Sequence, residues 1–177
     1  MWRAKRRHFL LGLVTAVAAC ASPASAQALR PDQAFQSLKA LVGDWQGRTA
    51  AGRTFLVSYG LIAGDTVLVE SWTMSPTRTS MTVYHMDGDV LIATHYCPQG
   101  NQPRLQYRPD LSGQRLHFTF RDATNLNDPN AAHQHAFWIE IAPGTNAFTR
   151  DETYLENGEA GSETATYTRI RQPTSNP

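Results

Sequence analysis

The chain of 177 residues is poor in cysteine, which excludes a fold that depends on disulfide bonds. It contains only Cys20 and Cys97. Cys20 lies in a segment that we expect to be removed or acylated during export, so Cys97 has no partner within one mature chain. A lone thiol in an oxidising compartment is usually buried and inert. The mature protein therefore has no disulfide framework of its own.

Sequence motifs of the common enzyme classes are also absent. The chain has no Gly-x-Ser-x-Gly elbow, phosphate-binding loop or dinucleotide fingerprint. An enzyme stays open as an alternative, because Cys97 beside His95 could supply a thiol nucleophile. The same two residues, with His133 and His135, could bind zinc, copper or iron. We favour structural roles for these histidines and assign no catalytic residue and no metal ligand. We also expect no cofactor; haem or a transition metal is the alternative.

Acidic residues are missing before Asp32, and much of the basic charge lies in the same segment. Four of the 16 Lys and Arg residues fall within residues 3–7. A chain starting at Gln27 would carry 12 basic and 15 acidic residues, for a net charge of −3. Because a nucleic-acid surface needs a clustered basic patch, we expect no nucleic-acid partner.

Residues 1–26 have the pattern of an export signal. A basic segment precedes the apolar run 9–19, and Ala24-Ser25-Ala26 forms a small-x-small cleavage site. The apolar run is too short for a permanent membrane span. Arg6-Arg7-His8-Phe9-Leu10 resembles a twin-arginine signal, and an ordinary secretory signal is the alternative. The sequence therefore predicts an exported, periplasmic protein.

A second processing site competes with cleavage after Ala26. Val17-Ala18-Ala19-Cys20 resembles a bacterial lipobox, in which the cysteine is acylated and becomes the first residue. We favour cleavage after Ala26, because the leading Val is less typical than Leu. Only acylation of Cys20 would give the protein a membrane partner, as an outer-membrane lipoprotein.

The rest of the chain predicts one all-β domain over residues 35–171, after a tether at 27–34 and before a disordered tail at 172–177. Pro31-Asp32 begins a helical pattern that ends at Gly43. From Trp45 onward the chain shows short segments rich in aromatic and β-branched residues, separated by turn residues. Including the strand at Trp45, these segments predict ten strands in an antiparallel meander, closed into a barrel or packed as a sandwich. The other nine span residues 54–61, 66–73, 79–86, 89–97, 104–108, 115–121, 133–141, 147–155 and 163–170.

The segment 81–104 holds the densest group of reactive side chains. Asp87-Gly88 predicts a two-residue hairpin turn of type I′, which pairs Met86 with Asp89. Because side chains alternate along a strand, His95 and Cys97 then share a face with Tyr84 and other polar residues. The opposite face is more apolar, and the pattern leaves open which of the two faces points inward.

The short helix leading into Leu41-Val42-Gly43-Asp44-Trp45-Gln46-Gly47 resembles the Gly-x-Trp entry of the calycins, which include lipocalins, fatty-acid-binding proteins and nitrobindins. The ten expected strands, and the segments 87–104 and 122–135, resemble uncharacterised exported bacterial members with calycin-like barrels. The resemblance implies a ligand-binding barrel. Nitrobindin-like proteins bind haem through a His on a late strand, but residues 163–169 contain none, so that ligand is not carried over.

These observations predict an exported β-barrel that binds a small, partly apolar molecule. In fatty-acid-binding relatives an inward Arg holds a carboxylate, and the resemblance therefore draws attention to Arg104 and Arg169. An envelope protein with a filled barrel and no ligand is a further alternative. The candidate ligand-binding residues are Tyr84, His95, Cys97, Arg104, His133, His135 and Arg169.

Overall fold

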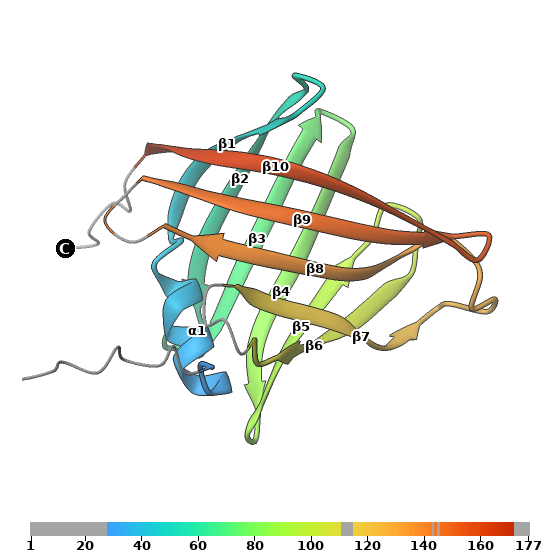
Figure 1. Ribbon diagram of the computed structural model, residues 1–177, viewed down its shortest axis with the longest axis horizontal. Coiled ribbons are helices and arrows are strands. Elements are labelled where there is room, and N and C mark those ends of the chain that lie inside the picture. The colour runs from blue at the N-terminus through green and yellow to red at the C-terminus, as the bar shows by residue number, and fades with distance from the viewer. Residues whose placement is uncertain (1–27, 111–114, 143, 145, 172–177) are drawn as a thin grey trace, which may run out of the picture.

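A computed structural model of the protein describes residues 28–110, 115–142, 144 and 146–171 (Figure 1). Within these residues one helix precedes ten antiparallel strands, which follow one another around a closed barrel. The predicted ten-stranded meander barrel with a short N-terminal helix is therefore confirmed. The elements are α1 (Pro31–Lys39), β1 (Gly43–Thr49), β2 (Thr54–Ile62), β3 (Val67–Ser75), β4 (Arg78–Asp87), β5 (Val90–Tyr96), β6 (Gln102–Arg108), β7 (Leu116–Thr124), β8 (His133–Ile141), β9 (Ala147–Glu156) and β10 (Glu159–Arg171).

The barrel closes where the first strand meets the last. Trp45 of β1 lies opposite Arg169 of β10, and Thr49 lies opposite Ala165. β10 also pairs with β9 along most of its length. Closure gives the first and last strands a partner on each side, which removes the unpaired edges that an open sheet would present.

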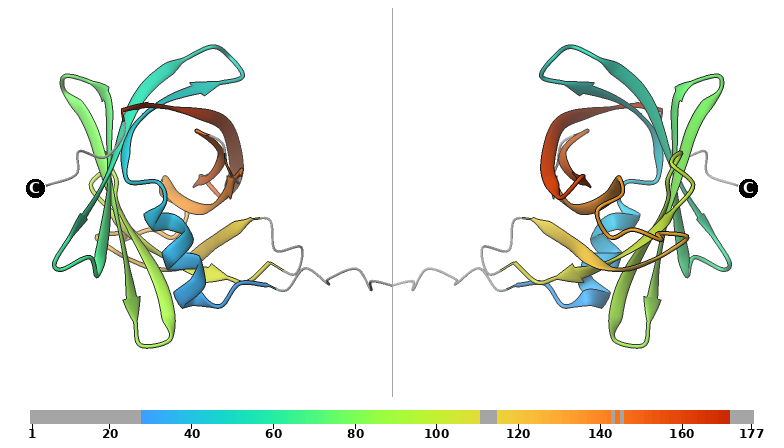
Figure 2. Two further views of the ribbon diagram at one scale, coloured as in Figure 1. Left: turned by 90° about the vertical axis from the view of Figure 1, so that its left-hand side faces the viewer. Right: turned by 90° about the vertical axis from the view of Figure 1, so that its right-hand side faces the viewer.

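Helix α1 lies at one end of the barrel (Figures 1 and 2). Pro31 supplies a φ angle suited to the first helical turn, and Ala34, Phe35 and Leu38 form its buried face. The guanidinium of Arg169 donates to the carbonyl oxygens of Ala40 and Val42 just after the helix, at 2.8 and 2.5 Å. The helix is therefore held against the barrel by its apolar face and by the last strand.

The helix begins at Pro31, so the second half of the expected 27–34 tether belongs to it. The expected export signal at 1–26 and the expected tail at 172–177 lie outside the described residues. No helix within the described part of the chain is long and apolar enough to cross a membrane.

Aromatic rings fill the lumen near α1. Phe148 stacks on Tyr167, with ring centres 4.2 Å apart, and packs edge-on against Trp45 at 4.8 Å. Phe118 and Phe137 form a second stack at 4.6 Å. All five rings are buried, and each contributes about 1.5–3 kcal/mol through the apolar area that it removes from water. This part of the lumen is a core and leaves the other end for a cavity.

The expected register of the hairpin between β4 and β5 is wrong by two residues. Asp87 pairs with Val90, so the turn is Gly88-Asp89 and not Asp87-Gly88. Gly88 has a φ of 62°, whereas Asp89 is not among the residues with positive φ. This suits a type II′ turn, which places glycine first, and not the expected type I′ turn. A shift of two residues leaves each side chain on the face to which it was assigned.

The polar face of this hairpin points into the barrel. Thr82 and Tyr84 on β4, His95 on β5 and Cys97 just after β5 are all buried. The register places Thr82 directly opposite His95. The structure thus resolves the orientation that the hydrophobic pattern had left open.

The Phe118 ring offers a test of the aromatic core. We expect Phe118→Ala to lower the free energy of unfolding by about 3–5 kcal/mol, because the cavity it leaves cannot collapse between packed rings. The adjacent Thr119 is exposed, and Thr119→Ala should change the free energy by less than about 1 kcal/mol. Urea unfolding of both variants measures the difference. Similar small losses in the two would contradict this description of the core.

Candidate functional site

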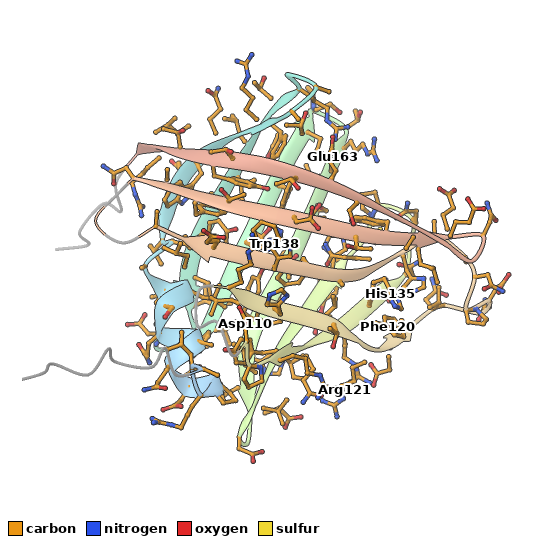
Figure 3. All side chains as sticks on the ribbon, in the orientation of Figure 1. Asp110, Phe120, Arg121, His135, Trp138 and Glu163 are labelled. Carbon is orange, nitrogen blue, oxygen red and sulfur yellow. The ribbon has the colours of Figure 1, made fainter. Side chains whose placement is uncertain are left out.

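A cavity of about 440 Å³ occupies the lumen away from α1. Its wall comes from the ends of β1 to β5 that are remote from the helix, and from β9 and β10. Exposed residues on its wall, including Arg53, Arg78 and Glu163, show that it opens to solvent; Figure 3 labels Glu163 on β10. We call it the lumen cavity; its lining residues are Thr49, Arg53, Thr54, Phe55, Trp72, Met74, Ser75, Arg78, Ser80, His95, Pro98, Gln99, Arg150, Glu152, Tyr154, Glu163, Ala165 and Tyr167.

Three aromatic rings form the apolar wall of the lumen cavity. Phe55 stacks on Trp72, with ring centres 4.9 Å apart and planes at 18°, and meets Tyr167 edge-on at 5.7 Å. Gly47 allows this arrangement, because a Cβ there would overlap the Phe55 ring. The rings offer a surface for the planar or apolar part of a ligand.

A buried ion pair lies where the lumen cavity meets the aromatic core. Nη1 of Arg150 is 2.7 Å from both carboxylate oxygens of Glu70, and neither side chain is exposed to solvent. Trp72 Nε1 and the Tyr84 hydroxyl also donate to Glu70. The Arg150 guanidinium lies over the Phe137 ring, 4.3 Å from its centre. These contacts fix Arg150 in one position.

The electrostatics of the pair favour a charged Arg150. Burial opposes the charge, but Glu70, and to a lesser extent Glu152, raise the pKa of Arg150 well above its ordinary value. The guanidinium therefore remains protonated, and its charge is balanced within the protein by a carboxylate in direct contact.

Glu152 extends the cluster from the ion pair into the lumen cavity. Its Oε1 lies 2.8 Å from Arg150 Nη2 and accepts a hydrogen bond from Gln134 Nε2 at 3.1 Å. Burial raises the pKa of Glu152, while Arg150 opposes that shift. The Glu152 side chain is 21% exposed to solvent, whereas the side chains of Glu70 and Arg150 are fully buried. Glu152 is thus the acidic group of the cluster that a ligand can reach.

His95 forms the neutral polar side of the lumen cavity. Its Nδ1 lies 3.0 Å from the Thr82 hydroxyl, and its Nε2 lies 3.3 Å from the Tyr154 hydroxyl. Burial, together with the positive charge of Arg150, lowers the pKa of His95 from 6.5 to about 4. The ring is therefore uncharged at neutral pH and can exchange hydrogen bonds with a ligand.

Three of the predicted ligand-binding residues lie in or beside the lumen. His95 lines the cavity. The Tyr84 side chain points inward, but its hydroxyl already donates a hydrogen bond to Glu70 beneath the cavity. Cys97 is buried at the end of β5, and its thiol donates to the Gln99 side chain.

The other four lie away from the cavity wall. Arg104 is exposed and forms an ion pair with Asp122 on the neighbouring strand. Arg169 holds the end of α1. On β8, His135 Nδ1 lies 3.3 Å from His133 Nε2. The His135 ring also stacks on the Phe120 ring, with ring centres 5.5 Å apart; Figure 3 labels these two residues.

The thiol and metal alternatives find little support in this geometry. Burial raises the pKa of Cys97, which disfavours the thiolate that a nucleophile requires. Among the described residues, no three His, Cys, Asp or Glu side chains come close enough to hold a metal ion. His95, Cys97, His133 and His135 therefore do not form one metal-binding group.

Sequence reasoning missed Glu70, Arg150 and the place of Glu152 on the cavity wall. A signal was present, because Glu70 alternates with Leu68 and Trp72 on one face of its strand. Arg150 likewise alternates with Phe148 on β9. A charged residue at an apolar position of a strand indicates a buried ionic group, since side chains two apart share a face.

Comparison with known proteins finds no family model that matches the chain and no curated protein whose sequence matches it.

The buried pair predicts a strong dependence of stability on Arg150. We expect Arg150→Met to lower the free energy of unfolding by about 3–5 kcal/mol, because it leaves Glu70 buried without its counter-charge. Arg104→Met, in the exposed pair with Asp122, should leave the free energy nearly unchanged. Denaturant unfolding measures both. Equal effects of the two substitutions would contradict the importance of the buried pair.

His95 predicts a pH dependence in mildly acidic solution. The unfolded chain binds a proton near pH 6.5, whereas the folded protein binds it only near pH 4. His95 therefore lowers the stability of the fold as the pH falls through this window, by roughly 3 kcal/mol in total.

NMR titration of the His95 ring should show that it stays neutral down to about pH 4. The stability difference between the parent protein and His95→Gln should decrease by the same roughly 3 kcal/mol as the pH falls from about 7 to about 4. A ring that titrates near its ordinary pKa would contradict the burial described for His95.

Proposed function

We propose that the protein is an exported, calycin-like barrel that binds a small, partly apolar molecule in the lumen cavity. The observation that supports this most is the lumen cavity, which places polar groups beside an aromatic wall. Ligand sites in proteins are typically concave, mainly apolar and equipped with a few convergent polar groups, with volumes of about 300–1,000 Å³. A cavity of about 440 Å³ falls within this range.

The fold supports the calycin-like part of the proposal. The helix, the Asp44-Trp45 entry into β1 and the closed ten-stranded meander occur in the order that the resemblance implies. The buried Trp45 donates from Nε1 to the Leu41 carbonyl at 2.6 Å, which connects the entry strand to the segment after the helix. In closed barrels that hold one small ligand, that ligand lies inside the lumen.

Export is proposed from the sequence alone. The basic segment, the apolar run and the Ala24-Ser25-Ala26 site support release into the periplasm after cleavage. Acylation of Cys20 would instead anchor the barrel to a membrane. The intact mass of the exported protein distinguishes a chain that begins at Gln27 from one with a lipidated Cys20.

A probe that fluoresces in apolar surroundings tests the binding function. N-phenyl-1-naphthylamine is uncharged, and we expect it to bind one site per protein. Ala165→Phe should weaken its binding at least about tenfold, because Ala165 lines the lumen cavity and a ring there would fill part of it. Fluorescence titration gives the affinity.

Thr166→Phe is the matched control, since Thr166 is the next residue on β10 and its side chain is exposed. It should bind the probe as the parent protein does. No binding to the parent protein would overturn the proposed function, and equal binding by both variants would place the probe outside the lumen. Thermal unfolding confirms that each variant is folded.

A further inference from the structure

We propose that the lumen cavity binds organic cations, with Glu152 accepting an N–H from a protonated amine while the aromatic wall contacts the apolar body of the ligand. This inference rests on the proposed function and specifies the charge of the ligand. It depends on the accessible oxygen of Glu152, on the charges around that oxygen and on the uncharged groups nearby.

Glu152 offers a ligand one carboxylate oxygen that the protein does not use. Its Oε1 contacts Arg150 and accepts a hydrogen bond from Gln134. No described residue donates a hydrogen bond to Oε2, and Oε2 is not among the buried atoms that lack a partner, so it keeps accessible surface. Because Glu152 lines the cavity, a ligand there can approach Oε2. Hydrogen bonds between a carboxylate and an ammonium are about twice as strong as neutral ones.

The neighbouring guanidinium does not cancel the attraction for a cation. Arg150 borders the cavity, but its side chain is fully buried, and both oxygens of Glu70 lie 2.7 Å from its Nη1. Glu70 therefore balances the charge of Arg150, and an ionised Glu152 gives the cluster one negative charge in excess. A cation beside Glu152 neutralises the cluster, whereas an anion would increase the excess.

A second carboxylate lies on the same wall of the cavity. Glu163 on β10 is directly opposite Glu152 on β9, and both residues line the cavity. Like charges at opposite positions of neighbouring strands destabilise a sheet, because their Cβ atoms are only about 4.5–5.5 Å apart. Arg53 contacts Glu163 at the exposed mouth, where solvent weakens the interaction. A ligand cation on Glu152 therefore reduces a repulsion that the protein itself contains.

The rest of the cavity wall does not oppose a cation. Arg78 begins β4 and is exposed at the mouth, so solvent screens its charge. His95 is uncharged at neutral pH, because burial lowers its pKa to about 4, and it lies beside the Tyr154 hydroxyl. The inner part of the cavity thus combines the carboxyl group of Glu152 with uncharged polar groups and the aromatic wall.

This arrangement differs from the one that the resemblance to fatty-acid-binding proteins implies. There an inward arginine holds the carboxylate of the ligand. Here the inward arginine is buried against Glu70, a carboxylate of the protein itself, and the accessible group is the acidic Glu152. Amines are therefore the expected ligands, and fatty acids are not.

Three probes that share one naphthalene ring test the inference. They are 2-naphthylmethylamine, 2-naphthalenemethanol and 2-naphthoate, which are cationic, neutral and anionic. At about pH 8 the amine stays protonated, and Glu152, whose pKa is raised by burial, is favoured in its ionised form. Displacement of N-phenyl-1-naphthylamine gives each affinity. We expect the amine to bind at least about tenfold more tightly than the alcohol, a difference of about 1.4 kcal/mol, and the carboxylate to bind most weakly.

Glu152→Gln tests the physical cause of this preference. The substitution removes the charge and keeps the size of the side chain, so the amine should bind within about twofold of the alcohol. Glu140→Gln is the matched control, because Glu140 lies outside the cavity in an exposed pair with Arg115. It should keep the preference of the parent protein. Thermal unfolding and circular dichroism confirm that both variants are folded.

The outcomes separate this inference from the proposed function. If N-phenyl-1-naphthylamine binds in the lumen but the alcohol or the carboxylate matches the amine, or none of the three displaces it, the inference is wrong and the binding function stands. A preference for the amine that survives in Glu152→Gln also overturns the inference. If neither N-phenyl-1-naphthylamine nor any of the three probes binds the parent protein, both proposals fall. Should Glu152→Gln not fold, the order of the three probes on the parent protein decides the inference.

Discussion

The contact between Glu70 and Arg150 organises the interior of this barrel. Their strands, β3 and β9, lie far apart in the meander, and the ion pair connects them across the lumen. On one side of the pair the interior is packed with rings down to α1. On the other side lies the lumen cavity, whose wall includes Arg150 itself. A buried ion pair is costly unless its remaining hydrogen-bonding groups are satisfied, and Trp72 and Tyr84 provide this for Glu70.

The cavity is polar on one side because β9 continues to direct every second side chain inward beyond the ion pair, and these further side chains are polar. Phe148 belongs to the core, Arg150 to the pair, and Glu152 and Tyr154 to the cavity wall. One strand thus passes from apolar core to polar site within seven residues, with inward side chains at every second position. The aromatic wall, built on β2, β3 and β10, supplies the apolar half of the site.

Much of the fold could be predicted from the sequence, because its signals are local. Turn residues and β-branched segments located the strands, and Pro31 with the apolar spacing after it located the helix. The hairpin at Gly88 shows where local signals fail. A glycine with positive φ suits the second position of a type I′ turn or the first position of a type II′ turn. The choice between the two turns sets the strand register, and the residues around Gly88 do not make that choice. Strand order and closure agree with the resemblance, which the residues at Trp45 had suggested.

The site was harder to predict, because its central contact joins residues 80 positions apart. Apolar neighbours on the same strand face indicate that Glu70 and Arg150 are buried, but they do not indicate that the two pair with each other. His95 was found because it ends a strand in a polar segment, whereas Arg169 was considered as a ligand partner and instead binds the carbonyls after α1. Pairing across a lumen depends on the closed topology, which single-strand patterns do not contain.

The barrel closes by pairing β1 with β10, so the fold cannot be completed until β10 has been synthesised. During synthesis, β1 emerges from the ribosome first among the strands, and its partner β10 emerges last. Until then the hydrogen-bonding edge of β1 is open, and the Trp45 ring lacks both Phe148 and the Arg169 guanidinium, which lies 4.0 Å from its centre. Such an edge can pair with another nascent chain. The topology that protects the finished barrel therefore exposes its precursor to aggregation, and a factor that shields β1 until release would raise the yield of folded protein.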